Sequence, residues 1–228
     1  SPSITRVSDP RETGFSLATS KESRGVRKWV TKALQLEFQR RGWDLDQLCL
    51  SFIGYEGAES HVASQKRIVD RIVKAHGGLG VGTGPGVLYD QKKFDTPYLR
   101  DFLLDQGAAG DVSETAAPWS KLRGVYDSVV AAAEGAYAQL GRKGWIMCHL
   151  SHSYHSGACL YFTFAFVMGE EPLVEYDIVK SAVQQAFVDS GGVVSHHHGV
   201  GVEHSPWLER DISPEGIAVM SGLFGAVD

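Results

Sequence analysis

Apolar residues recur along this 228-residue chain at helical spacing in some segments and at strand spacing in others. Between Ala58 and His76, for example, Val62, Ile68 and Ile72 fall on one face of a helix, and the paired glycines that follow are a helix stop. Stripes and stop signals of this kind predict helices over Ser23–Arg41, Ala58–His76, Thr96–Gln106, Trp119–Leu140, Leu173–Ser190 and Ser205–Val227, the last as one or two short helices.

Two neighbouring segments, Trp145–His152 and Ala158–Val167, alternate in polarity and are rich in aromatic rings, which predicts an antiparallel pair of strands. Further strands are predicted at Phe15–Thr19, Leu48–Tyr55 and Asp111–Thr115. Alternation of strands and helices also suits a parallel sheet. The tight hairpin and the small number of strands favour antiparallel units instead. We therefore predict an α+β fold, an antiparallel sheet with flanking helices, built from two ferredoxin-like β-α-β blocks.

Composition narrows the class of protein. A hydrophobic content of 43% and a charged content of 21% suffice for a proper core in one or two globular units, with possible subdomains at 1–90 and 91–228. The net charge of −5, without a long run of one sign, argues against a surface for nucleic acid. The first twenty residues lack the layout of a signal peptide. The cysteines, Cys49, Cys148 and Cys159, are expected to be reduced core residues of an intracellular protein.

Three consecutive histidines, His196, His197 and His198, are the most distinctive chemical feature of the chain. Imidazole exchanges a proton near neutral pH without further help, and the nearby Gly199 and Gly201 let a ligand approach the backbone. A solvated polar turn is the alternative, but three adjacent histidines would be an unusual choice for one. The triplet therefore predicts proton-transfer chemistry.

A second group of histidines, His149, His152 and His155, is spaced by three and raises the question of a metal. On a strand this spacing alternates between faces and then enters a turn, so the three side chains would not converge. We therefore predict no metal site.

Four other polar side chains are candidates for ligand contact, each with an architectural alternative. Arg100 has a planar fork suited to a phosphate or carboxylate, or it pairs with an acid on its own helix. Thr115 either presents a hydroxyl to a site or caps a helix. Tyr154 lies beside the hairpin turn and is free to contact a ligand, whereas Tyr161, in mid-strand, is by default a core aromatic.

Four motifs occur here in the order in which they occur in one family. They are Tyr98-Leu99-Arg100-Asp101, Glu114-Thr115-Ala116-Ala117-Pro118-Trp119, Gly157-Ala158-Cys159-Leu160-Tyr161-Phe162 and Ser195-His196-His197-His198-Gly199-Val200-Gly201. The chain resembles the alkyldihydroxyacetonephosphate synthase-like FAD-linked oxidases of the vanillyl-alcohol-oxidase superfamily. The resemblance implies that residues 1–228 are the C-terminal cap or substrate domain.

The resemblance also implies a cofactor and a set of site residues. FAD would be held mainly by a separate N-terminal domain that is missing from this chain, which would be the partner of this one. Arg100 would bind substrate, while Tyr161, His196, His197 and His198 would be catalytic, with the phenol of Tyr161 facing the flavin. Thr115 and Tyr154 would contact the cofactor. Isolated from its partner domain, the chain is expected to be inactive.

The implied reaction exchanges the acyl chain of acyl-dihydroxyacetone phosphate for a fatty alcohol, with no net redox change, in ether lipid synthesis. Which histidine is the base stays open. Glu203 follows the triplet where this family would place basic residues, and its charge would repel a phosphate. This departure favours a rival in the same superfamily, an FAD-linked oxidoreductase of a 2-hydroxy acid such as D-lactate or glycolate. A non-catalytic binding or assembly domain is a third reading.

The expected partners and location follow from the same resemblance. The substrate would be a lipid-like small molecule, and a homodimer and a peripheral membrane contact both stay open. We expect a cytoplasmic location in a bacterium and a peroxisomal one in a eukaryote. No stretch of the chain reaches the roughly 20 apolar residues of a membrane span.

Overall fold

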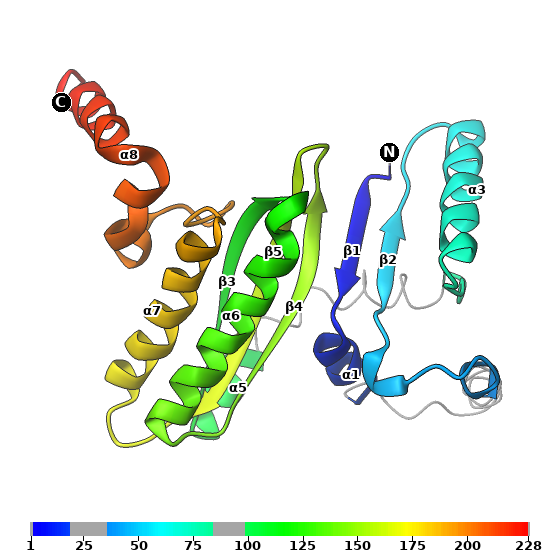
Figure 1. Cartoon of the computed structure of the whole chain (residues 1–228), viewed down its shortest axis with the longest axis horizontal. Helices are drawn as coiled ribbons and strands as arrows, with labels where there is room; N and C mark the ends of the chain where they lie inside the picture. The colour runs from blue at the N-terminus through cyan, green and yellow to red at the C-terminus, as the bar shows by residue number, and fades with distance from the viewer. Residues whose placement is uncertain (1, 19–35, 84–98, 228) are drawn as a thin grey trace.

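A five-stranded antiparallel sheet in the order β2-β1-β4-β5-β3 forms the centre of the protein (Figure 1). The structure, a computed structural model, describes residues 2–18, 36–83 and 99–227. The strands are β1 (Ile4–Ser8), β2 (Ser51–Gly54), β3 (Ala108–Pro118), β4 (Gly144–Ser153) and β5 (Gly157–Val167). The predicted α+β class, with helices flanking an antiparallel sheet, is confirmed.

Two long helices, α6 (Trp119–Leu140) and α7 (Pro172–Ser190), cover one face of the sheet (Figure 1). Alternate residues of β5 point into the core between sheet and helices: Phe162, Phe164 and Phe166 are at most 2% exposed. Burying rings of this size is the main favourable contribution to the stability of the fold. Both helices were predicted, α6 with the bounds that the structure shows.

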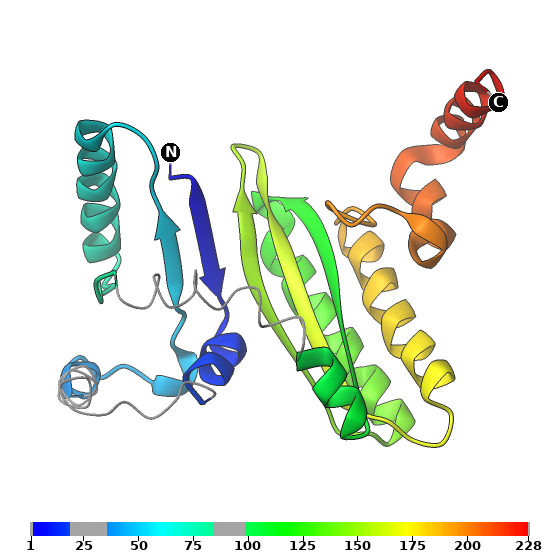
Figure 2. The ribbon, with the colours of Figure 1, turned by 180° about the vertical axis from the view of Figure 1, so that it is seen from behind.

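The remaining alternate side chains of each strand point to the opposite face of the sheet. Register pairs Glu114 of β3 and His149 of β4 with Tyr161 of β5, so these three side chains share that face. Helix α5 (Leu99–Asp105) packs on one end of it, where Leu103 lies against Gly110. No helix of the described residues lies over the middle of this face (Figure 2).

The predicted hairpin is confirmed, with a register shift between Leu150 and His152 of β4. Helix α3 (Glu59–Ala75) and strand β2 also lie within their predicted segments. Strand β1 continues the sheet, because its Val7 and Ser8 pair with Leu150 and His149 of β4. The division into 1–90 and 91–228 stays a prediction, since its boundary falls outside the described residues.

Two expectations are wrong, and one strand was missed. The strand predicted at Phe15–Thr19 is wrong, because Pro10–Ala18 forms helix α1. Asp9 caps this helix by accepting a hydrogen bond from the backbone N–H of Glu12 at 2.7 Å. Strand β1 was not predicted at all. Cys49 is exposed and is not a core residue, whereas Cys148 and Cys159 are buried as expected.

The C-terminal segment forms helix α8 (Gly201–Gly225), interrupted by the non-helical residue Ser213, which agrees with one or two short helices. Residues 36–40 are helical as expected, but most of the predicted Ser23–Arg41 helix and the first residues of Thr96–Gln106 lie outside the described part of the chain. Among the helices that the structure describes, none combines the length and the apolar composition that a membrane crossing requires.

Candidate active site

The face of the sheet opposite α6 and α7 is called the uncovered face below. The histidine triplet reaches it because the loop after α7 crosses the free edge of β3. The backbone N–H of Val193 donates to the carbonyl of Ala116, 3.1 Å away. The carbonyl of Val193 in turn accepts from Thr115 Oγ1 at 2.6 Å. These two bonds tie the loop to the edge strand of the sheet. A rigid strand therefore sets the position of the residues that follow.

Tight packing accompanies this crossing. Gly191 ends α7 with a φ of 87°, in the left-handed region that favours glycine. A Cβ on Gly192 would lie 2.6 Å from Thr115 Oγ1, so that position also excludes a side chain. The sequence predicts a helix stop at these paired glycines. In the structure they also let the loop pack against β3.

The three imidazoles surround one carboxylate, that of Glu114. Its Oε2 lies 3.7 Å from His196 Nδ1, 3.9 Å from His197 Nδ1 and 3.6 Å from His198 Nε2. His197 has a φ of 64°, which turns the chain between its neighbours. A residue other than glycine in this region is strained, and such strain is concentrated at functional sites.

Glu114 is 4% exposed, and its other oxygen is held by two donors. Ser151 Oγ donates to Oε1 at 3.0 Å and Cys159 Sγ at 2.9 Å. Burial raises the pKa of the Cys159 thiol, and its hydrogen bond to Glu114 raises it further, so this cysteine stays a neutral donor. The carboxylate is therefore fixed in orientation, with Oε2 directed at the histidines.

His196 is the inner member of the triplet. Its Nε2 lies 3.1 Å from Tyr154 Oη, and its Nδ1 is buried without a hydrogen-bond partner among the described residues. Burial lowers the pKa of His196, and neighbouring His197 lowers it further. His197 and His198 are more open, with side chains 53% and 36% exposed. A substrate would thus meet His197 and His198 first.

Tyr161 lies at the centre of the same face. Its ring stacks on that of His149, with centroids 4.8 Å apart, and meets the ring of His198 edge-on at 5.7 Å. Burial raises the pKa of the Tyr161 phenol, and the negative charge of Glu114 adds to the shift. The phenol is therefore protonated at neutral pH and can donate a hydrogen bond.

A buried group of charged residues holds His149, the ring on which Tyr161 stacks. His149 Nδ1 lies 3.1 Å from Glu12 Oε1, which also accepts from Arg6. Burial alone would raise the pKa of Glu12, but the hydrogen bond with His149 and the positive charge of Arg6 outweigh it, so that pKa is lowered. This arrangement fixes the His149 ring on which Tyr161 stacks.

The remaining predicted site residues are placed differently. Arg100 is exposed on α5, which packs on the same face as Tyr161, and its side chain forms no hydrogen bond or ion pair with the described residues. Thr115 is fully buried on the side of the sheet that α6 and α7 cover, so its hydroxyl holds the loop and does not reach the uncovered face. Tyr154 does join the triplet, through His196.

Sequence reasoning did not select Glu114, although it is the first residue of a motif that was noted. Its position was the available signal. Glu114 directly precedes Thr115 in one strand, so the two side chains point to opposite faces of the sheet. The group His149, His152 and His155 does not converge, as expected. His152 instead meets the ring of His197 edge-on at 4.7 Å, while His149 faces Glu12.

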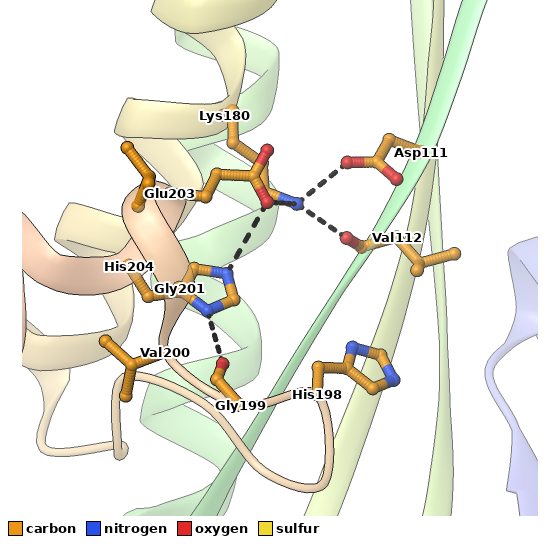
Figure 3. Close-up of a pocket in the computed structure, with 10 residues that line it drawn as sticks. Asp111, Val112, Lys180, His198, Gly199, Val200, Gly201, Glu203 and His204 are labelled. Atoms are coloured by element: carbon orange, nitrogen blue, oxygen red, sulfur yellow. Dashed lines mark hydrogen bonds and ion pairs between the residues drawn. The ribbon is translucent and has the colours of Figure 1, made fainter.

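A pocket of about 250 Å³ adjoins the triplet at His198 (Figure 3). Lys180 Nζ, at its wall, lies 2.8 Å from Asp111 Oδ2 and 3.6 Å from Glu203 Oε2. The imidazole of His204 donates from Nδ1 to the carbonyl of Gly199 at 2.9 Å, which closes the turn at the start of α8. Two carboxylates thus offset the charge of one lysine, and the pocket has no surplus positive charge.

Comparison with known proteins identifies relatives of this chain. A family model described as FAD linked oxidases, C-terminal domain, matches residues 1–228. An alkyldihydroxyacetonephosphate synthase from Dictyostelium discoideum is 35% identical over 230 residues, 100% of this chain and 38% of the relative. One of that name from Trypanosoma brucei brucei is 31% identical over 229 residues, 100% of this chain and 37% of the relative.

The likeness extends to three dimensions. A solved structure described as alkyldihydroxyacetonephosphate synthase matches with a TM-score of 0.76 and 30% sequence identity. The match covers 95% of this chain and 39% of that one. The chain described here thus spans less than half the length of the relatives that it matches.

Proposed function

Because the chain belongs to the family of C-terminal domains of FAD-linked oxidases, we propose that it supplies the substrate side of the active site in an alkyldihydroxyacetonephosphate synthase-like enzyme. The family predicted from four motifs is confirmed. One observation supports the proposal above the others: His196, His197 and His198 converge with Tyr161 and Glu114 on the uncovered face of the sheet.

That face fits a flat aromatic cofactor. The middle of the face is free of described helices, and it carries the protonated phenol of Tyr161 beside the imidazole of His198. Tyr161 and His198 would lie against the flavin, whose phosphates would be held by the N-terminal part of the polypeptide. When bound, the isoalloxazine ring supplies the reactive centre at which the substrate is activated.

The residues of this chain would then bind substrate and move protons. His198 is the proposed acid–base group, because it contacts Tyr161 and also lines the adjoining pocket, whereas the Nδ1 of His196 is buried. Tyr161 would donate a hydrogen bond to a developing negative charge. Arg100, exposed on α5 on the same side of the sheet, would hold the phosphate of the substrate.

The proposed reaction exchanges the acyl chain of acyl-dihydroxyacetone phosphate for a fatty alcohol. A second candidate is oxidation of a 2-hydroxy acid such as D-lactate or glycolate. The charge balance at Lys180 favours this candidate over a phosphate, because Asp111 and Glu203 leave no surplus cation in the pocket and the single charge of a hydroxy acid is repelled less than the double charge of a phosphate. The synthase proposal therefore relies on Arg100 for the phosphate.

Two assays on the complete FAD-containing polypeptide separate these candidates. The synthase proposal expects a radiolabelled fatty alcohol to enter the ether product when acyl-dihydroxyacetone phosphate is present. His198→Ala is expected to slow this exchange by about 10²-fold or more, and Arg100→Ala to raise the KM for the phosphate substrate. Anaerobic bleaching of the flavin by a hydroxy acid, with no exchange, would establish the second candidate.

The matched control is His155→Ala, since His155 is an exposed residue of the β4–β5 turn, outside the triplet. Exchange at the normal rate in both His198→Ala and Arg100→Ala would mean that these residues are structural. In that case the chain would act as a binding or assembly domain.

A further inference from the structure

We propose that Glu114, His152, His196 and His197 form a binding site for a divalent cation of the zinc class. Each of the four residues offers one nitrogen or carboxylate oxygen, and these atoms all lie within 4.8 Å of one another. Three imidazoles and one carboxylate are ligands that Zn²⁺ accepts in tetrahedral sites. Nothing in the comparisons assigns such a site.

The spacing of the donor atoms is close to what a bound ion needs. Metal–ligand bonds of about 2.0–2.2 Å in a tetrahedron place neighbouring ligand atoms about 3.3–3.6 Å apart. Glu114 Oε2 lies 3.7 Å from His196 Nδ1 and 3.9 Å from His197 Nδ1. Contraction by a few tenths of an ångström would close these two gaps, and the widest separation in the group, at most 4.8 Å, would need about 1.2 Å. The same separations are too long for good hydrogen bonds, so the atoms face one another without satisfying one another.

A buried donor atom points independently to a ligand. His196 Nδ1 is shielded from solvent and has no hydrogen-bond partner among the described residues. A buried polar atom without a partner costs free energy, and a cation between Nδ1 and Oε2 would remove that cost.

The outer contacts of the cluster have the form found around metal ligands. Ser151 and Cys159 both donate to Glu114 Oε1, which leaves Oε2 for the ion. Tyr154 Oη lies at hydrogen-bond distance from Nε2 of His196, the ring nitrogen opposite Nδ1. Contacts of this kind orient ligands and fix the tautomer of a histidine.

The site takes His152 from the β4 end, Glu114 from mid-β3, and the other two ligands from the loop after α7. Of the three histidines at spacing three, it uses only His152. An imidazole bound to a cation can neither accept nor donate a proton there, so occupancy would oppose any proton transfer through His196 or His197. The inference is nevertheless independent of the proposed function, because binding is measured without turnover.

The test is titration of the complete polypeptide, freed of metal with a chelator, with ZnCl₂ in an isothermal calorimeter. One Zn²⁺ per chain is expected, with zinc-edge X-ray absorption reporting only nitrogen and oxygen ligands. His152→Asn should weaken binding by about tenfold or more, and Glu114→Gln should do the same. His155→Asn, which alters a neighbouring exposed histidine, should leave the affinity unchanged.

Two results would overturn the inference. One is the absence of stoichiometric binding in the unaltered protein. The other is equal affinity in His152→Asn and His155→Asn, which would show that zinc binds to surface histidines in general. Because His152 is exposed, its replacement is not expected to unfold the protein, and a circular dichroism spectrum checks this. Zinc binding by a polypeptide that shows no exchange activity even when freed of metal would refute the proposed function alone.

Discussion

Replacing Lys180 by methionine tests how much one buried ion pair contributes to the structure beside the site. Lys180 is 5% exposed, and its Nζ lies 2.8 Å both from Asp111 Oδ2 and from the carbonyl of Val112. Methionine keeps the length of the side chain but removes the charge and the donor. Asp111 would keep the hydrogen bond from Tyr176, and the Val112 carbonyl would lose its side-chain donor.

The expected cost follows from burial. Removing one partner of a buried pair costs about 3–5 kcal/mol. The side chain of Asp111 is 24% exposed, so water relieves part of its lost interaction, and we expect the lower end, about 3 kcal/mol. Lys74→Met is the matched control. Lys74 pairs with Asp70 at 2.7 Å, almost the same distance, but both side chains are more than half exposed. Exposed pairs within one helix are worth about 0.3–0.5 kcal/mol.

Urea unfolding followed by far-ultraviolet circular dichroism measures both costs in the complete polypeptide. Adding Asp111→Asn to Lys180→Met should restore part of the lost stability, because it removes the uncompensated carboxylate. The reasoning is refuted if Lys180→Met costs no more than Lys74→Met. It is also refuted if the double variant is less stable than Lys180→Met alone.

Three further predictions concern other parts of the chain. Thr115→Val should cost about 1–3 kcal/mol in unfolding free energy, because the Val193 carbonyl loses its donor, whereas Thr115→Ser should cost less; equal losses would mean that the hydroxyl is unimportant. The lowered pKa of Glu12 means that its contribution to stability is present above its unfolded pKa of about 4.5 and is lost as the pH falls through the folded value. The acid side of a plot of melting temperature against pH should therefore be shallower for Glu12→Gln, and an unchanged slope would contradict the assignment. Phe162→Ala should cost about 3–5 kcal/mol by leaving a cavity, measured by urea unfolding against Phe162→Leu, and a cost below 1 kcal/mol would show that the core collapses around the change.

Patterns that repeat over many residues were predictable from the sequence. The aromatic alternation in β5 and the stripe of α6 each depend on residues within one element, and both were located correctly. Strand β1 was missed because five residues with two apolar members carry no pattern of their own, and its partners are distant in the chain. Helix α1 was missed for a different reason. Asp9, Pro10 and Glu12 form a helix-start signal, but the apolar residues of Phe15–Thr19 indicate a strand.

Some residues of the candidate site were predicted from the sequence, but their arrangement was not. Histidines 196–198 and Tyr161 were selected, but the carboxylate that collects them was not. Its role depends on the register that pairs Glu114 with Tyr161 and on the loop crossing the β3 edge, and neither is encoded near Glu114 in the sequence. Thr115 was selected for the same motif, yet the alternation of the strand turns it to the other face.

The two faces of the sheet differ in how freely their residues can be replaced during evolution. Phe162, Phe164 and Phe166 point to one side of β5, and Cys159 and Tyr161 point to the other. The hydrophobic core therefore depends mostly on one set of alternate positions, and the proposed chemistry depends on the other. Substitutions at the more exposed positions of the second set leave the three phenylalanine rings in place, so one scaffold can acquire a new substrate while its hydrophobic interior stays the same.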